Sequence, residues 1–379
     1  MKTLQTFGWP FGATALGLAG ALLTWGPAGL AAVGVLAVLE VSLSFDNAVV
    51  NATVLRRMNA FWQKMFLSVG ILIAVFGMRL LFPLLVVAAT TGGTPAAVLD
   101  MALNRPDAYA EHLEHAHPAI AAFGGTFLLM IALDFFLDEE REVRWLRLVE
   151  GALARAARLE RLSVLAALAV LATTAQVLAG PKQSTVLLAG VLGLATYLAV
   201  DGLSQLFQRE GDGPAGTEPE QATPGPRPPA RGRAAFFLFL YLEVLDASFS
   251  FDGVVGAFAI SQNIFQIALG LGIGAMYIRS LTVHLVRQGT LDNYVYLEHG
   301  AHYAIGALGG ILIVSIRYDV PQAVTSAIGV AFILAAFLSS LARNRRARQT
   351  AVILAPGAPP APGAPGPDKP EPAHDGADA

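Results

Sequence analysis

Two short acidic motifs lie inside apolar stretches of this 379-residue chain. The first reads LEVSLSFDNAVVN at residues 39–51, and the second reads LDASFSFDGVVGA at residues 245–257. The first contributes Glu40 and Asp46, and the second contributes Asp246 and Asp252. One carboxylate at the centre of a bilayer costs about 2.5–3.5 kcal/mol on the membrane-insertion scale. Carboxylates at such depth normally face a cavity or a charged partner, so the motifs predict a pathway for a cation or for protons.

The polar side chains of both motifs carry hard oxygen donors. The predicted ion-pathway residues are Glu40, Ser44, Asp46, Asn47, Asp246, Ser250 and Asp252, and the four carboxylates Glu40, Asp46, Asp246 and Asp252 are the predicted metal ligands. Such oxygens suit Mg²⁺, Ca²⁺ or Mn²⁺. The chain has no cysteine, which excludes thiolate metal sites and disulfides. We expect the divalent cation to be cargo rather than a resident cofactor, with protons carried by the same carboxylates.

Helical geometry leaves the arrangement of the first motif open. In an unbroken helix Glu40 and Asp46 lie about 120° apart around the axis. Either protein surrounds this helix on both faces, or the helix unwinds locally and brings the two carboxylates together. Arg79 and Arg279, each inside a later apolar segment, are the expected neutralising partners. An alternative is that they form packing ion pairs with Asp46 and Asp252.

The composition predicts the elements that must position these groups. Hydrophobic residues make up 55% of the chain and charged residues only 14%, against about 25% charged in soluble proteins. This disfavours a soluble enzyme, a nucleic-acid binder and a disordered scaffold, and predicts an all-α polytopic membrane protein with the lipid bilayer as a partner. About ten apolar segments are long enough to be transmembrane helices, at 7–25, 28–50, 66–90, 118–137, 162–180, 184–206, 235–260, 264–286, 301–317 and 321–342.

The domain organisation follows from these segments and from two proline-rich stretches. We expect a first transmembrane helix (1–27), a first repeat half with a charged cytoplasmic helix (28–161), an additional helix pair (162–207), a disordered cytoplasmic linker (208–234), a second repeat half (235–342) and a disordered cytoplasmic tail (343–379). Most of the 25 Lys and Arg residues fall on one side of this topology. The positive-inside rule then predicts a multi-pass protein of the cell membrane with both termini cytoplasmic.

An internal repeat links the two halves. After the acidic motifs, LEHAHPAIAAFGG (113–125) matches LEHGAHYAIGALGG (297–310) with one insertion. The copies begin at the second and the seventh predicted helix, and this odd offset predicts an inverted repeat with a site near the bilayer midplane. Glu114 and His115, with their counterparts Glu298 and His299, are candidate gates. The alternative is that they are interfacial polar residues at helix starts.

The segment Glu40–Asn47, which reads EVSLSFDN, resembles the signature of TerC-type integral membrane proteins. The resemblance covers residues 28–342, and the match is nearest to a bacterial subgroup catalogued only as a domain of unknown function. The TerC family was named for tellurium resistance and is similar to LysE-type transporters. Its members are implicated in manganese efflux, which implies that Glu40, Asp46, Asn47, Asp246 and Asp252 form the ion pathway. Gly253 replaces Asn47 in the second motif, so any such site is asymmetric.

The sequence therefore predicts a secondary transporter, not an enzyme, that exports a divalent cation, with manganese favoured and proton exchange as the coupling. The alternative is a non-transporting TerC-like membrane factor that acts in tellurite or envelope stress resistance by binding partners. An intramembrane aspartyl protease is disfavoured because Gly-x-Gly-Asp is absent around Asp46 and Asp252. No nucleic-acid partner is expected.

Overall fold

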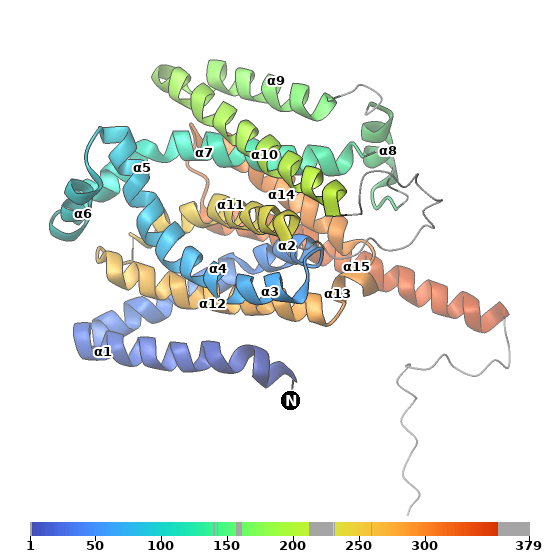
Figure 1. Cartoon of the computed structure of the whole chain (residues 1–379), viewed down its shortest axis with the longest axis horizontal. Coiled ribbons are helices and arrows are strands. Elements are labelled where there is room, and N and C mark those ends of the chain that lie inside the picture. The colour runs from blue at the N-terminus through green and yellow to red at the C-terminus, as the bar shows by residue number, and fades with distance from the viewer. Residues whose placement is uncertain are drawn as a thin grey trace, which may run out of the picture.

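A computed structural model of the chain describes residues 2–138, 141, 143–156, 161–211, 230, 232–258 and 260–354 (Figure 1). All regular elements in these ranges are helices. They are α1 (Lys2–Leu43), α2 (Phe45–Leu55), α3 (Ala60–Leu67), α4 (Val69–Leu72), the π-helix η1 (Ile73–Leu81), α5 (Phe82–Thr91), α6 (Pro95–Asn104), α7 (Pro106–Phe136), α8 (Arg147–Ala156), α9 (Leu162–Val177), the 3₁₀-helix η2 (Gly180–Lys182), α10 (Gln183–Gly211), α11 (Gly232–Ala257), α12 (Ile264–Arg287), α13 (Thr290–Asn293), α14 (Leu297–Ser315) and α15 (Gln322–Leu354).

Helix α1 folds back on itself at Gly26. This residue has φ 69° and ψ −166°, a conformation that only glycine adopts without strain, and Pro27 follows it. The helix therefore consists of two limbs, seen in blue at the lower left of Figure 1. The bend falls between the predicted segments 7–25 and 28–50.

Seven helical stretches in the described residues are long and apolar enough to cross a membrane. They are Phe7–Leu43, Ala60–Thr91, Pro106–Phe136, Gly180–Leu203, Ile264–Arg287, Leu297–Ser315 and Gln322–Arg346. Many of their outward side chains are apolar and exposed, such as Leu23 at 85%, which fits contact with lipid. The prediction of a helical multi-pass membrane protein is confirmed, but its count of ten spans is not.

Three differences separate the ten predicted segments from these seven. Segment 7–25 and most of segment 28–50 fall within the single stretch Phe7–Leu43, which bends at Gly26. Predicted segment 162–180 forms α9, which has only 16 residues. Predicted segment 235–260 forms α11, in which the side chains of residues 250–252 and 255 lie outside the described part of the chain. Helix α15 continues to Leu354, past residue 342 where the second repeat half was predicted to end. Most of the predicted linker and the tail from 355 onward lie outside the described residues.

The helices that carry the two acidic motifs run antiparallel. Just after α2, the backbone N–H of Asn59 donates to the carbonyl of Ala230, and the N–H of Ala230 donates to the carbonyl of Arg57 at 2.8 Å. The end of α2 thus lies beside the start of α11. At the opposite end of α11, a Cβ on Gly253 would lie 3.4 Å from Glu40 Oε2. The two motifs therefore approach each other from opposite directions.

The helices that carry the second repeated motif, α7 and α14, also pack antiparallel. Near one end the rings of Phe135 and His302 stack with centroids 3.6 Å apart. In the middle, the backbones of Gly125 and Gly309 approach so closely that a Cβ on Gly309 would lie 3.2 Å from the Gly125 carbonyl oxygen. Small residues permit this kind of close crossing between membrane helices. The glycine pair common to both copies is thus the point where the two copies cross.

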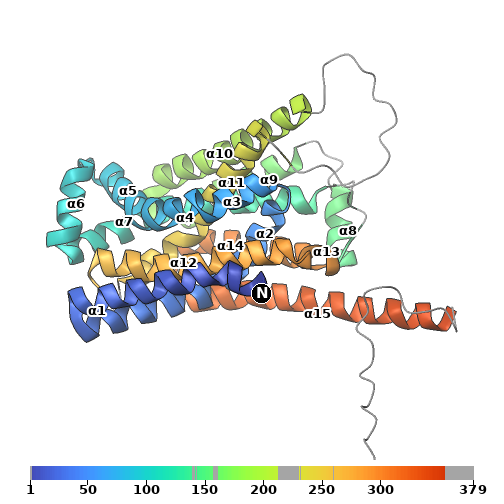
Figure 2. The same ribbon diagram turned by 60° about the horizontal axis from the view of Figure 1, so that its bottom comes forward.

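The ends of the bundle differ in charge. Helices α8 and α13 and the arginine-rich end of α15 extend at one end, on the right of Figures 1 and 2. Helix α6 and the bend of α1 lie at the other end. The arginine-rich segments therefore gather at one end of the protein, which we call the arginine-rich end.

Substitution at the glycine crossing tests this packing. We expect Gly309→Ala to destabilise the protein by about 1–3 kcal/mol, because its methyl group would press on backbone atoms of α7 that have little room to move. The matched control Gly310→Ala meets no atom within 4 Å and should leave stability unchanged. Thermal unfolding of the purified protein in detergent measures both, and equal midpoints would contradict the proposed crossing.

Candidate functional site

The first acidic motif surrounds a one-residue interruption of its helix. Helix α1 ends at Leu43 and α2 begins at Phe45, with Ser44 between them at φ −106° and ψ 15°. The Ser44 N–H still donates to the Glu40 carbonyl at 3.0 Å, so the chain bends without opening. The Ser44 hydroxyl also donates to Glu40 Oε1, at 3.3 Å. Glu40 and Asp46 are not brought together, and each faces a different neighbouring helix.

Glu40 forms a buried ion pair with Arg79. The arginine donates from Nη2 to Glu40 Oε1, and both side chains are at most 5% exposed. Its Nη1 donates to the carbonyl of Ala74, five residues earlier, at 2.8 Å. Arg79 is supplied by the π-helix η1, in which backbone bonds span five residues, and such wide turns are frequent at functional sites.

The second motif forms a corresponding pair with an added acid. Arg279 of α12 donates to Asp246 Oδ2 at 2.8 Å and to both oxygens of Glu243 at 2.9 Å. The predicted site residues did not include Glu243. One signal for it exists, because the tripeptide Leu-Glu-Val at 39–41 recurs at 242–244, one helical turn before Asp246. Arg279 therefore has two carboxylate partners, whereas Arg79 has one.

Asp46 is buried without an arginine. Its side chain is 7% exposed, and Oδ1 has no hydrogen-bond partner. It lies against Gly329 of α15, where a Cβ would overlap the carboxylate. Arg79 thus pairs with Glu40 and not with Asp46. Ser250 and Asp252 belong to α11, but their side chains lie outside the part of the chain that the structure describes.

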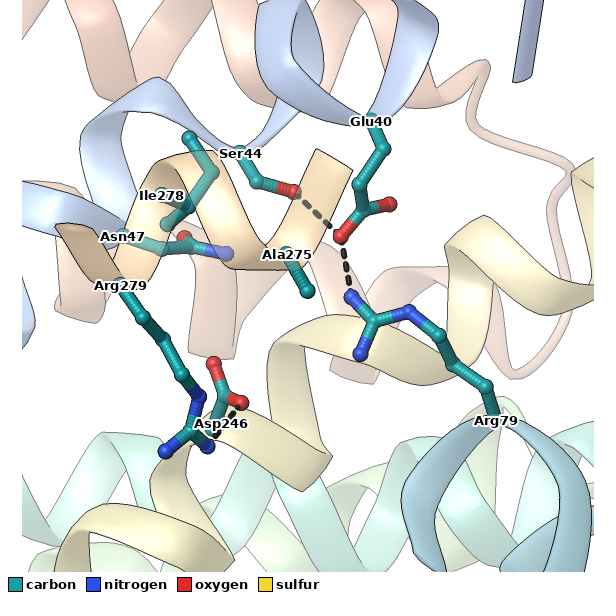
Figure 3. Close-up of a pocket in the computed structure, with 8 residues that line it drawn as sticks. All are labelled: Glu40, Ser44, Asn47, Arg79, Asp246, Ala275, Ile278 and Arg279. Carbon is teal, nitrogen blue, oxygen red and sulfur yellow. Dashed lines mark hydrogen bonds and ion pairs between the residues drawn. The ribbon is translucent and has the colours of Figure 1, made fainter. Parts of the chain in front are cut away.

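Both acid–arginine pairs face one small cavity, drawn in Figure 3. It is lined by Glu40, Ser44, Asn47, Arg79, Asp246, Ala275, Ile278 and Arg279. Its volume of about 10 Å³ is close to what one water molecule requires. Two glycines leave room for the acid–arginine pairs. A Cβ on Gly70 would lie 2.8 Å from Glu243 Oε1, and a Cβ on Gly274 would overlap the aliphatic part of the Glu40 side chain.

Negative charge is in excess around the helices that carry the two acidic motifs. The buried carboxylates of these helices with described side chains are Glu40, Asp46, Glu243 and Asp246, and the buried guanidinium groups near them are Arg79 and Arg279. Two carboxylates therefore remain uncompensated if all these groups are ionised. Such a surplus in a low-dielectric interior favours the uptake of protons or of a cation.

The predicted metal ligands do not form a ready-made cage. Within the described residues, no group of three or more His, Asp or Glu side chains is placed to hold a metal ion. Glu40 and Asp246 are bonded to arginines, and Asp46 faces α15. A cation in the cavity would therefore compete with Arg79 and Arg279 for their carboxylates.

Ion pairs enclose Glu298, the candidate gate residue at the arginine-rich end. Glu298 accepts a bond from Arg56 Nη2 at 2.5 Å, and Arg57 and Arg141 each approach it to 3.8 Å. His299 is 3% exposed, and its Nε2 lies 2.8 Å from the Val143 carbonyl oxygen. We call Glu298 with Arg56, Arg57 and Arg141 the latch.

The repeat counterparts at the other end have a different environment. Glu114 and His115 are exposed and line a cavity of about 580 Å³, which we call the vestibule. Its other lining residues are Glu111, His117, Gly256, Ile311, Ser315, Asp319, Val320, Gln322 and Thr325. The same Leu-Glu-His sequence is thus enclosed at one end of the protein and open at the other.

Comparisons with known proteins give one match. A family model described as "Protein of unknown function (DUF475)" matches residues 45–347. No curated protein and no solved structure matches the chain. The matched range contains Asp46, both arginines and the whole second motif, but begins after Glu40.

The two acids of the first motif should respond differently to neutralisation. Glu40→Gln leaves the Arg79 charge buried without a counter-charge, and breaking a buried pair in this way costs about 3–5 kcal/mol. The matched change Asp46→Asn removes a charge that has no arginine partner, so we expect it to destabilise the protein less than Glu40→Gln, by under about 3 kcal/mol. Denaturant or thermal unfolding in detergent measures both.

A double variant supplies the control. Glu40→Gln combined with Arg79→Met removes both charges and should recover much of the loss caused by Glu40→Gln alone. Equal losses for Glu40→Gln and Asp46→Asn, or no recovery in the double variant, would contradict this account of the ion pair.

Proposed function

The chain belongs to the DUF475 family of proteins of unknown function, and from its site we propose that it is a secondary transporter that moves a cation across a membrane. The observation that carries this proposal is the buried excess of carboxylates over guanidinium groups around the motif helices. A purely structural role would be served by matched pairs. Asp46 lies in the first turn of α2, and its Oδ1 is buried without a hydrogen-bond partner, which suits a group that binds a cation or a proton in turn.

The antiparallel packing supports an inverted repeat. Both repeated segments, α1–α2 with α11 and α7 with α14, lie side by side in opposite directions. In transporters built from inverted repeats, the site lies where the copies meet, and access alternates as one part rocks against the other. The two acid–arginine pairs facing one cavity fit such a site. By the positive-inside rule we assign the arginine-rich end to the cytoplasm, with both termini there.

We assign a divalent cation as the cargo, with manganese first, on two grounds. Carboxylate, hydroxyl and amide oxygens are the ligands that such ions prefer. The EVSLSFDN motif also resembles the TerC-type signature. Export of two positive charges against 100 mV costs about 4.6 kcal/mol, so a driving ion is needed. Protons would serve as this driving ion, by binding to the carboxylates when the cation leaves them.

One observation favours a second candidate. Glu40 and Asp246 are each bonded to an arginine, and the cavity between the pairs is small. Paired charges and a small cavity would be enough for a non-transporting membrane factor in tellurite or envelope stress resistance that acts through partner proteins. Flux measurements separate the two candidates.

Reconstituted protein tests transport directly. Proteoliposomes loaded with a manganese-sensitive dye should show Mn²⁺ flux that increases when a pH gradient is imposed, compared with protein-free liposomes. We expect Asp46→Asn to lower this flux at least about tenfold, equivalent to about 1.4 kcal/mol, because the carboxylate can no longer bind the ion or the proton.

The matched control is Gly310→Ala, which meets no neighbouring atom and should transport normally. Parallel vesicles tested with Mg²⁺ and Ca²⁺ define the cargo. Wild-type flux in a folded Asp46→Asn protein would remove Asp46 from the mechanism. Absence of flux for all three ions in the native protein would favour the non-transporting factor.

A further inference from the structure

The vestibule and the latch occupy repeat-related positions and are in opposite states. At the vestibule, Glu114 is exposed, and the side chains of Glu111 and His115 are 74% and 66% exposed. At the latch, the side chain of Glu298 is 18% exposed and that of His299 is 4% exposed. The two copies thus present the same residues open at one end of the bundle and enclosed at the other.

One face of α15 leads from the vestibule to Asp46. Gln322 and Thr325 line the vestibule, and Gly329 lies against the Asp46 carboxylate. These three positions are spaced three and four residues apart, so they follow one another along a single face of the helix. Asp46 is therefore about one turn below the vestibule wall, and its Oδ1 is buried without a hydrogen-bond partner.

A second line of contacts leads from the vestibule to Glu40. Gly256 is exposed in the vestibule, and Gly253 is buried one turn deeper in α11. A Cβ on Gly253 would lie 3.4 Å from both Gln322 Nε2 and Glu40 Oε2. Among the described side chains, that of Gln322 lies between the vestibule and Glu40, beside the backbone of α11 at Gly253. Asparagine at this position, as in the first motif, would fill that space.

The vestibule lining has the charge that would attract a cation. Its carboxylates are Glu111, Glu114 and Asp319, and its lining residues include no lysine or arginine. Lys182 donates to the backbone carbonyl of His115 at 3.0 Å. Acidic clefts of this kind raise the local concentration of cations.

The latch closes the arginine-rich end with more than ion pairs. Arg141 lies over the ring of Phe135 at 3.5 Å, and Phe135 stacks on His302. The buried carboxylate of Glu150 in α8 accepts the backbone N–H groups of Trp145 and Leu146 at 2.9 and 3.1 Å. Residues 143–146 are thereby held against α8, and the Val143 carbonyl contacts His299 at the start of α14.

We infer that the vestibule is the access route to Asp46 and Glu40, with Gln322 and Gly253 as its neck, and that the latch closes the opposite route in the same conformation. This inference rests on the proposed transport function for its purpose. Its geometry is tested separately, by the accessibility of single thiols, which does not require flux. The chain has no cysteine, so each introduced cysteine is the only thiol.

The experiment uses full-length protein in proteoliposomes, with a protease-sensitive tag after α15 to report which end faces outward. Thr325→Cys places a thiol in the vestibule wall, and Ser340→Cys, on the same helix, replaces a fully buried hydroxyl that bonds the Tyr296 N–H at 2.9 Å. Cationic and anionic methanethiosulfonate reagents that do not cross membranes are applied to each side. Rates are compared with those of an exposed surface thiol.

We expect Thr325→Cys to react only from the side opposite the tag, and to prefer the cationic reagent at least about tenfold. Ser340→Cys should react from neither side. Adding Glu298→Gln should weaken the latch and raise the reaction of Ser340→Cys severalfold from the tagged side, with Thr325→Cys as the internal check on folding.

Other outcomes would overturn the inference. Reaction of Thr325→Cys from the tagged side, or no preference for the cationic reagent, would show that the vestibule is not a cation route from the opposite side. Reaction of Ser340→Cys while the latch is intact would show that the latch does not close this end. An unchanged rate for Ser340→Cys after adding Glu298→Gln, in a protein whose Thr325→Cys still reacts, would show the same of Glu298. Loss of Mn²⁺ flux alone, with these reactions as expected, would count against the proposed function and not against the access route.

Discussion

A buried guanidinium group cannot be left without a counter-charge in an apolar interior, and this requirement organises the centre of the protein. Arg279 is 1% exposed and has two carboxylate partners, while Arg79 is 3% exposed and has one. The helices that carry these groups must approach closely, which explains the glycines at 70 and 274 beside the pairs. Once the arginines are satisfied, Asp46 remains as the acid available to another positive charge.

Several of these features were predictable from residue types alone. The apolar runs predicted a helical membrane protein correctly, and the repeated acids indicated where polar chemistry would concentrate. The pairing of particular groups was not predictable, because it depends on how each helix is rotated and bent. The six-residue spacing of Glu40 and Asp46 was compatible with two arrangements, and the turn at Ser44 is a tertiary outcome.

Glu243 and Gly329 were missed for different reasons. Glu243 lies outside the aligned repeat, since its counterpart position in the first copy is an alanine, and only the displaced Leu-Glu-Val sequence pointed to it. Gly329 has no side chain, so no sequence rule for charged or polar groups would select it. Its importance comes from the Asp46 carboxylate that packs against it. The count of ten spans is not confirmed, because α9 is short, part of α11 lies outside the described side chains, and the first two predicted segments form one stretch that bends at Gly26.

The π-helical turn that holds Arg79 has a mechanical consequence. A wide turn accommodates one more residue than an α-helical turn, so the segment Ile73–Leu81 contains slack that its neighbours lack. Shifting the wide turn along this segment would rotate Arg79 around the helix axis relative to Glu40. Because an isolated buried guanidinium group is costly, such a change of winding requires another counter-charge for Arg79, and it is therefore coupled to the charge state of the site.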